Sequence, residues 1–260
     1  MVRSMKNSRR WYTRPSIISV SPVQKKISVS NQLHNELKKE FQLERLILFS
    51  VAVFAIAIIL LVIEIKIPDK EFLKEHGGLS DATILNALSH LVPKFIGFLI
   101  SFSLIGLYWS IHHRMFGFVT SYDRKLLFLN LLFLFFVALM PFSTGFYGEF
   151  AGSELFEKQL KVPMTFYVLN LCCVGFANYF MWRHIGNEKN KLAEPPIDPL
   201  VLKLAYARSL VVPFLFLLML PVAYLTNVLF AVYIPMLIPL VLRILRRQIR
   251  KKHEKIHVEK

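Results

Sequence analysis

Long apolar runs separated by short polar stretches dominate the chain from residue 46 onward. The first run, at 46–63, holds 18 residues without a charged side chain. At about 1.5 Å per helical residue it extends about 27 Å, close to the hydrocarbon thickness of a bilayer. Five similar runs are expected at 84–111, 126–147, 162–182, 204–225 and 227–245. The pattern predicts an all-α integral membrane protein with six transmembrane helices per subunit.

The chain differs in character before and after these runs. Residues 1–30 are basic, without periodicity and with little apolar content, which is typical of a disordered tail. Residues 31–45 repeat apolar positions every four residues and are expected to form a helical lead-in. No signal peptide is recognised. We therefore expect three parts, namely a basic cytosolic N-terminal part at 1–44, a six-span channel domain at 45–245 and a basic cytosolic tail at 246–260.

The charge distribution predicts the orientation in the membrane. The formal net charge is +15, from 32 Lys and Arg against 17 Asp and Glu. Most of the bases lie in the two tails and in the loops after spans two and four. The positive-inside rule then places both termini in the cytosol, with anionic inner-leaflet lipid as the expected partner of the basic tails. No recognition motif supports nucleic-acid binding.

Candidate catalytic or metal-binding groups are few. His112 and His113 end the second span, but the spacing of a zinc box is absent. Cys172 and Cys173 are adjacent, so they form no Cys-x-x-Cys pair. The chain also lacks the nucleophile elbow, the phosphate-binding loop and the TVGYG filter. We expect no metal, no cofactor and no enzymatic activity, and we expect Arg208 in span five to snorkel to the interface.

One face of the first span is wholly apolar across the membrane. At 100° per residue this face begins at Arg45, just before the apolar run, and continues with Phe49, Ala52, Ile56, Ile59, Leu60 and Ile63. This stripe is either a lipid-facing or packing surface, or the wall of a pore. In the second case several copies of the helix meet around an axis, and rings of aliphatic side chains gate by dewetting. A pore of that kind requires an oligomer.

Three motifs in the first three spans occur in a recognisable order. The first span has Arg45, Phe49-Ser50, Ala55-Ile56-Ala57 and an end at Ile67-Pro68. The second has Pro93-Lys94-Phe95, Tyr108-Trp109 and His112-His113-Arg114-Met115-Phe116, and the third reads NLLFLFFVALMPFSTG at 130–145. This order resembles the transmembrane-protein-175 family, the endolysosomal potassium channels and their bacterial homologues. The resemblance covers residues 42–185, whereas the last two spans match by count and length alone.

The resemblance implies a potassium channel made of six-span subunits with both termini cytosolic. Single-repeat bacterial members are homotetramers of the plasma membrane in which four first spans line the pore. The family's constricting aliphatics fall on Ile56, Leu60 and Ile63, beside which Ala52 and Ile59 line the pore. The motif also assigns supporting roles to Arg45, Phe49, Ser50, Trp109, His112 and His113.

Two positions depart from the family pattern. The motif Asp falls on Val51, about 120° from the stripe, so its loss is expected to remove a contact with Trp109 or the His112–His113 pair. A common Thr falls on Ile59, which cannot replace part of an ion's hydration shell. We therefore expect a weakly selective monovalent cation channel. The alternative is a non-conducting scaffold or partner subunit of the same fold, and a membrane enzyme or a secondary transporter is less favoured.

Overall fold

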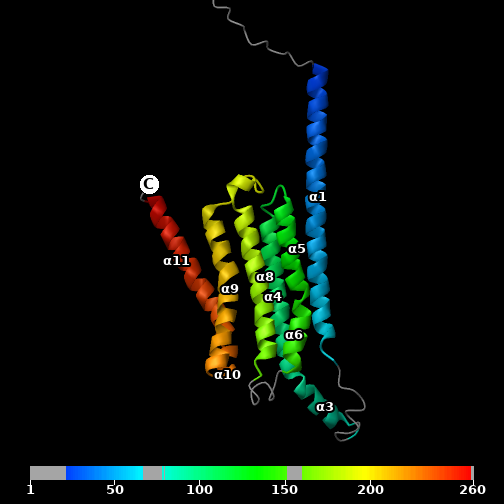
Figure 1. Ribbon diagram of the computed structural model, residues 1–260, viewed down its shortest axis with the longest axis vertical. Coiled ribbons are helices and arrows are strands. Elements are labelled where there is room, and N and C mark those ends of the chain that lie inside the picture. Colours follow the sequence, from blue (N-terminus) through cyan, green and yellow to red (C-terminus); the bar gives the residue numbers. More distant parts are fainter. Residues whose placement is uncertain (1–21, 67–77, 79, 151–159, 259–260) are drawn as a thin grey trace, which may run out of the picture. The chain divides into compact units, whose positions relative to one another are not determined.

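The computed structural model describes residues 22–66, 78, 80–150 and 160–258, and their regular elements are all helices (Figure 1). The elements are α1 (Pro22–Ile63), α3 (Asp81–His90), α4 (Val92–Phe116), α5 (Arg124–Ala138), α6 (Met140–Glu149), α8 (Val162–Ile185), η1 (Glu188–Asn190), α9 (Pro199–Leu225), α10 (Val228–Val232), η2 (Ile234–Leu237) and α11 (Ile238–Val258). Six segments are long and apolar enough to cross a membrane. The expected six-span, all-α class is confirmed.

Residues 1–41 and 42–260 form two separate compact units. Among the described residues, the first unit holds the N-terminal half of α1, which begins at Pro22. Residues 22–30 are therefore helical, although we expected them to belong to a disordered tail. The rest of that predicted tail, residues 1–21, lies outside the described residues. The packing described below concerns residues 42–260.

Prolines explain most differences between the predicted and the observed spans. The span expected at 84–111 is divided into α3 and α4, and Pro93 lies in the first turn of α4, where its missing N–H costs no hydrogen bond. α4 then continues to Phe116, five residues beyond the predicted end. The last span is interrupted between α10 and α11, where Pro235 and Pro239 follow each other closely.

Polar side chains fix the start of several helices. Asp123 accepts a 2.7 Å hydrogen bond from the N–H of Leu126 at the start of α5. Asp198 and Asn227 accept from the second residue of α9 and α10 at 2.6 and 2.8 Å. Such caps satisfy amide groups that lack a partner within the helix. The helices thus begin where the sequence supplies an acceptor.

Asp123 also ties the start of α5 to the end of α8. The Nε2 atom of His184 donates to the Asp123 carboxylate at 2.8 Å, while the Nδ1 atom of His184 accepts from Asn190 at 3.0 Å. Burial opposes ionisation of Asp123, but hydrogen bonds from the Leu126 N–H and His184 outweigh it, so the pKa of this carboxyl is lowered. A second link joins the same two segments: the hydroxyl of Ser121, just before α5, donates to the carbonyl of Lys191, just after η1, at 2.8 Å.

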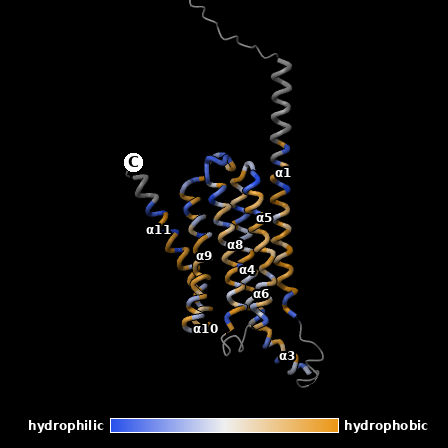
Figure 2. The backbone as a smooth tube through the Cα atoms, in the orientation of Figure 1, coloured by the Kyte–Doolittle hydropathy of each residue, from blue (hydrophilic) through white to orange (hydrophobic). Residues whose placement is uncertain are grey.

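α8 lies at the centre of the bundle. It packs against α5, α6 and α9, while α4 packs against α6. Leu171, Val174 and Met181 of α8 are fully buried. Figure 2 shows apolar residues along the middle of the helices and polar residues at the connection between α8 and α9. Since apolar side chains also cover the outside of the bundle, this distribution is that of a membrane protein.

Gly175 allows α8 and α9 to approach closely, and we expect Gly175→Ala to destabilise the protein. A Cβ atom there would meet the ring of Pro213, whose Cδ would lie at 2.9 Å, and the Tyr108 hydroxyl at 3.1 Å. Forcing a methyl group into such a site costs about 1–2 kcal/mol. The matched change is Gly106→Ala in α4, where nothing lies within 4 Å of the new Cβ. The unfolding temperature in detergent should fall for Gly175→Ala and stay level or rise for Gly106→Ala. Equal shifts of this temperature in the two variants would contradict the close approach of α8 and α9 at Gly175.

Candidate pore-lining helix and its anchor

The part of α1 that crosses the membrane has two distinct faces. The face that packs against the bundle consists of Leu43, Leu46, Ser50, Phe54, Ala57 and Leu61, all buried. The opposite face consists of Arg45, Phe49, Ala52, Ile56, Ile59, Leu60 and Ile63, all exposed. The centres of the two faces are about 140° apart at 100° per residue. α1 is therefore an apolar helix held by one side only.

The predicted pore-lining residues all lie on the exposed face. Ile56, Ile59 and Ile63 are 56%, 58% and 63% exposed in the single subunit, and Leu60 is 41% exposed. Ile56, the adjacent pair Ile59 and Leu60, and Ile63 follow one another at intervals of about one turn, so they form a continuous aliphatic surface about 10 Å long. A surface of this kind can face lipid, a neighbouring subunit or a water-filled pore.

A buried chain of polar side chains holds the packed face of α1. The Nδ2 atom of Asn130 in α5 donates to the Ser50 hydroxyl at 3.0 Å. Its Oδ1 atom lies 2.8 Å from the Nε2 atom of His112 in α4. Ser50 and Asn130 are 0% exposed and His112 is 3% exposed. One amide thus links three transmembrane helices, because it offers a donor to one and an acceptor to the other.

Aromatic rings surround the His112 imidazole. It stacks on Phe116 and Phe133 with ring centroids 4.4 and 5.5 Å apart, and Phe54 of α1 meets it edge-on at 5.6 Å. Phe54 also contacts Phe133 at 5.9 Å. The rings add shape-specific packing to the hydrogen bonds. Together they fix the rotation of α1 about its axis, which turns the aliphatic face away from the bundle.

Val51, where the family pattern has an Asp, is 39% exposed. Its neighbour Ser50 lies about 100° away around the helix, is buried and accepts a hydrogen bond from Asn130. The loss of a polar contact at Val51 stays a prediction. The two histidines have different surroundings: His112 is buried, whereas His113 is exposed and stacks on Trp109 with ring centroids 5.7 Å apart.

Asn130 is the important residue that the sequence analysis missed. The signal was present, because Asn130 is the lone amide in the apolar run from Leu126 to Met140. An amide in such a run must find partners inside the protein. Asn170 and Asn178 follow the same rule in α8, where they donate to Ser143 at 3.1 Å and Ser209 at 2.7 Å.

The chain is similar to known ion channels. The family model "Endosomal/lysosomal potassium channel TMEM175" matches residues 45–141. A potassium channel of Streptomyces collinus is 34% identical over 150 residues, which cover 58% of this chain and 67% of that protein. The human endosomal/lysosomal proton channel TMEM175 is 35% identical over 140 residues, which cover 52% of this chain and 26% of that protein.

A solved structure supports the fold over most of the chain. It is the crystal structure of a lysosomal potassium-selective channel TMEM175 homolog from Chamaesiphon minutus. The match has a TM-score of 0.61 at 23% identity and covers 78% of this chain and 97% of that one. The resemblance inferred from the motifs of the first three spans is thereby confirmed, and the chain belongs to the TMEM175 family.

Proposed function

We propose that the protein is a subunit of a passive cation channel that conducts potassium ions with weak selectivity. The observation that carries this proposal is the exposed aliphatic face of α1, on a helix whose rotation is fixed by buried contacts. A relative from Streptomyces collinus is named a potassium channel and the human relative a proton channel, so cation conduction is common to both names. An enzymatic role for His112 and His113 is discarded, because the family is one of ion channels.

The pore is formed by more than one subunit. A single α1 cannot surround a path for ions, so several copies must place their exposed faces around one axis. We propose a homotetramer with α1 of each subunit innermost. The polar anchor supports this arrangement, because Ser50 turns inward to the bundle and leaves only apolar side chains from Phe49 to Ile63 on the other face.

The narrow part of this pore is an aliphatic constriction. Rings of Ile56, Leu60 and Ile63 would create a section about 10 Å long without hydrogen-bonding groups. Water leaves narrow apolar sections readily, so the section conducts when the helices separate enough to keep it hydrated. Ions then pass with at least part of their hydration shell.

Weak selectivity follows from the same side chains. Ile59 is 58% exposed on the aliphatic face, where the family pattern has a Thr. A branched hydrocarbon cannot replace water oxygens around potassium, so little distinguishes potassium from sodium at this level. We therefore expect a small permeability ratio between the two ions.

We propose that both termini lie in the cytosol of a cell whose plasma membrane holds the channel. Three helix ends lie on one side of the bundle (Figure 1): the C-terminal ends of α8 and α11 and the N-terminal end of α9. That side carries the basic residues Arg114, Arg124, Lys125, Arg183, Lys189, Lys191 and Lys203. The other side has the ion pair between Lys94 and Glu149 at 2.8 Å. Most acids of the predicted outer loops lie outside the described residues.

The test is potassium flux into liposomes that contain the purified full-length protein. We expect flux above that of empty liposomes, with sodium flux within about tenfold of it, a difference of about 1.4 kcal/mol. Cross-linking in the same membranes should yield species up to four subunits. Flux at the level of empty liposomes would instead favour the non-conducting scaffold, for which the Val51 and Ile59 departures are the supporting observation.

A further inference from the structure

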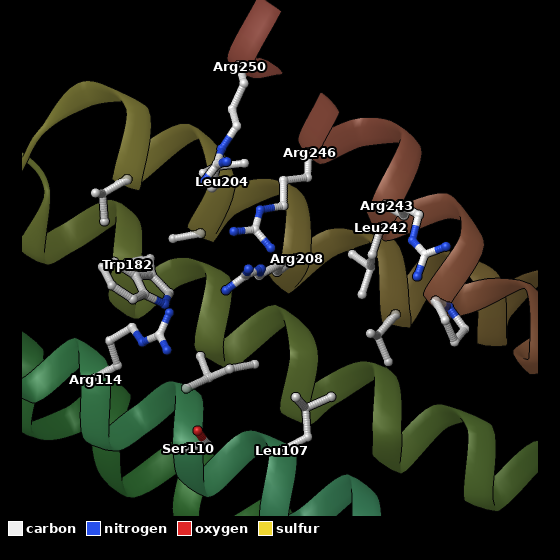
Figure 3. A pocket seen from close by; sticks show the side chains of 15 residues that line it. Leu107, Ser110, Arg114, Trp182, Leu204, Arg208, Leu242, Arg243, Arg246 and Arg250 are labelled. Atoms are coloured by element: carbon white, nitrogen blue, oxygen red, sulfur yellow. The ribbon is translucent and has the colours of Figure 1, made fainter. Parts of the chain in front are cut away.

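A cavity of about 640 Å³ lies between α4, α8, α9 and α11, and five arginines line it (Figure 3). Arg114 comes from α4 and Arg208 from α9, while α11 contributes Arg243, Arg246 and Arg250. Figure 3 shows the side chains of Arg114, Arg208 and Arg246 extending toward one another. The arginines thus converge from three helices that are far apart in the sequence.

The positive charges of the cavity are not balanced by acidic residues. No Asp or Glu lines it, and within the described residues up to Lys252 none of the five arginines forms an ion pair with a carboxylate. Arg208 is half-buried, and the charges of Arg114 and Arg246 repel it. Positive charges held together in this way attract an anion. Arg208, which the sequence predicts to reach the membrane interface, thus lines the cavity together with the other four arginines.

The remaining lining is mostly apolar, with two further hydrogen-bonding groups, the Ser110 hydroxyl and the Trp182 indole. Leu107 and Ile111 of α4, Leu204 and Val212 of α9 and Leu242 of α11 form the hydrocarbon part. Trp182 is 2% exposed, and its indole Nε1 has no hydrogen-bond partner. Figure 3 places this indole beside Arg114 at the edge of the cavity. An anion there would receive an N–H bond in addition to those from guanidinium groups.

We propose that this cavity binds the phosphate groups of an amphiphile, with the arginines on the phosphates and the apolar lining against the hydrocarbon. Guanidinium groups suit phosphate oxygens, because each presents two parallel N–H donors. Arg243 and Arg250 are seven residues apart and span about 10 Å along α11. This length matches two phosphates better than one. Basic pockets between transmembrane helices on the cytosolic side commonly hold such headgroups.

The proposal is independent of ion conduction. It uses the proposed orientation only to place the cavity at the cytosolic leaflet, where anionic headgroups are available. It also gives the basic C-terminal segment a specific role, because three of its arginines face the cavity. Arg247, Lys251 and Lys252 of the same helix do not line the cavity.

That difference supplies a matched test. Labelled cardiolipin, which has two phosphates, is titrated with the full-length protein in detergent, and labelled phosphatidylcholine serves as the blank. We expect the triple variant R243Q/R246Q/R250Q to bind cardiolipin about tenfold or more weakly than the parent. The control variant R247Q/K251Q/K252Q loses the same charge from the same helix and should bind within about twofold of the parent.

Two further measurements complete the test. The unfolding temperature should be alike for both glutamine triple variants. R243K/R246K/R250K keeps the charge but loses the paired N–H donors, so it should bind cardiolipin more weakly than the parent and more tightly than R243Q/R246Q/R250Q. Sodium pyrophosphate identifies the source of the phosphates: failure to displace cardiolipin at similar concentration supports a lipid, whereas displacement indicates a free diphosphate and overturns the assignment to an amphiphile. Equal loss in both glutamine variants, or loss in neither, would overturn the proposal.

Discussion

Potassium flux is expected to rise about tenfold or more when Ile56 is replaced by Asn. Ile56 is 56% exposed at the middle of the aliphatic face. In a pore built from several copies, Asn would add a ring of amide groups at the constriction and keep it hydrated. A reduction of about 1.4 kcal/mol in the barrier is enough for a tenfold increase. The measurement is potassium-dependent fluorescence change in liposomes at equal protein content.

Val62→Asn is the matched control for this change. Val62 lies on the same helix and is 52% exposed, but it is about 120° from Ile56 around the axis. It should leave flux within about twofold of the parent, apart from any loss of folded protein. If both variants changed flux equally, or if Ile56→Asn only reduced the yield of folded protein, the aliphatic face would be a lipid-facing surface.

Asn130→Ala is expected to lower stability by about 2–4 kcal/mol. The change leaves His112 and Ser50 without their shared partner in a buried site and opens a cavity between them. Hydrogen bonds between membrane helices contribute less than this by themselves, about 0.6 kcal/mol on average, so most of the effect comes from the orphaned group and the cavity. The measurement is the unfolding temperature in detergent.

Two serine substitutions distinguish the loss of the link between α1 and α5 from the loss of a serine hydroxyl alone. Ser50 and Ser103 both donate to the carbonyl four residues earlier, at 2.9 and 2.7 Å. Only Ser50 also accepts from Asn130, and Ser103 is exposed. We expect Ser50→Ala to cost about 1 kcal/mol and Ser103→Ala to cost nothing measurable. Equal effects would show that the anchor does not hold α1.

The periodicity of the first span predicted which residues share its aliphatic face, but not whether that face packs against the bundle. In a helix that crosses lipid, side chains have few alternative environments, so an apolar stripe at 100° per residue must be either packed or exposed as a unit. Ile56, Ile59 and Ile63 are accordingly all exposed, and Leu46, Phe54 and Leu61 are all buried. Which of the two faces would pack was not evident, because both are apolar.

The anchor could not be derived in the same way. Ser50, Asn130 and His112 lie on three helices, and their pairing depends on the depth and rotation at which those helices meet. A single polar residue in an apolar run shows that a partner is needed but not which one. The converging arginines of the cavity posed the same difficulty, since in the sequence Arg208 stands alone in an apolar span.

Breaks within the predicted spans were only partly predictable. Prolines are tolerated in membrane helices when neighbouring groups satisfy the freed carbonyls. Pro213 and Pro221 lie inside the continuous helix α9, whereas the Pro235 and Pro239 region separates α10 from α11. The residue type is the same in both cases, so the outcome depended on packing that the sequence does not reveal.

The uncharged character of α1 has a consequence for the response to membrane potential. Between Arg45 and Glu64 the helix contains no formally charged residue. The electric field performs work of about 2.3 kcal/mol per elementary charge moved through 100 mV. If α1 tilts or rotates when the pore opens, that stretch moves no formal charge through the field. Movement of residues 46–63 is therefore insensitive to voltage, and any voltage dependence of opening must originate in charges outside this stretch.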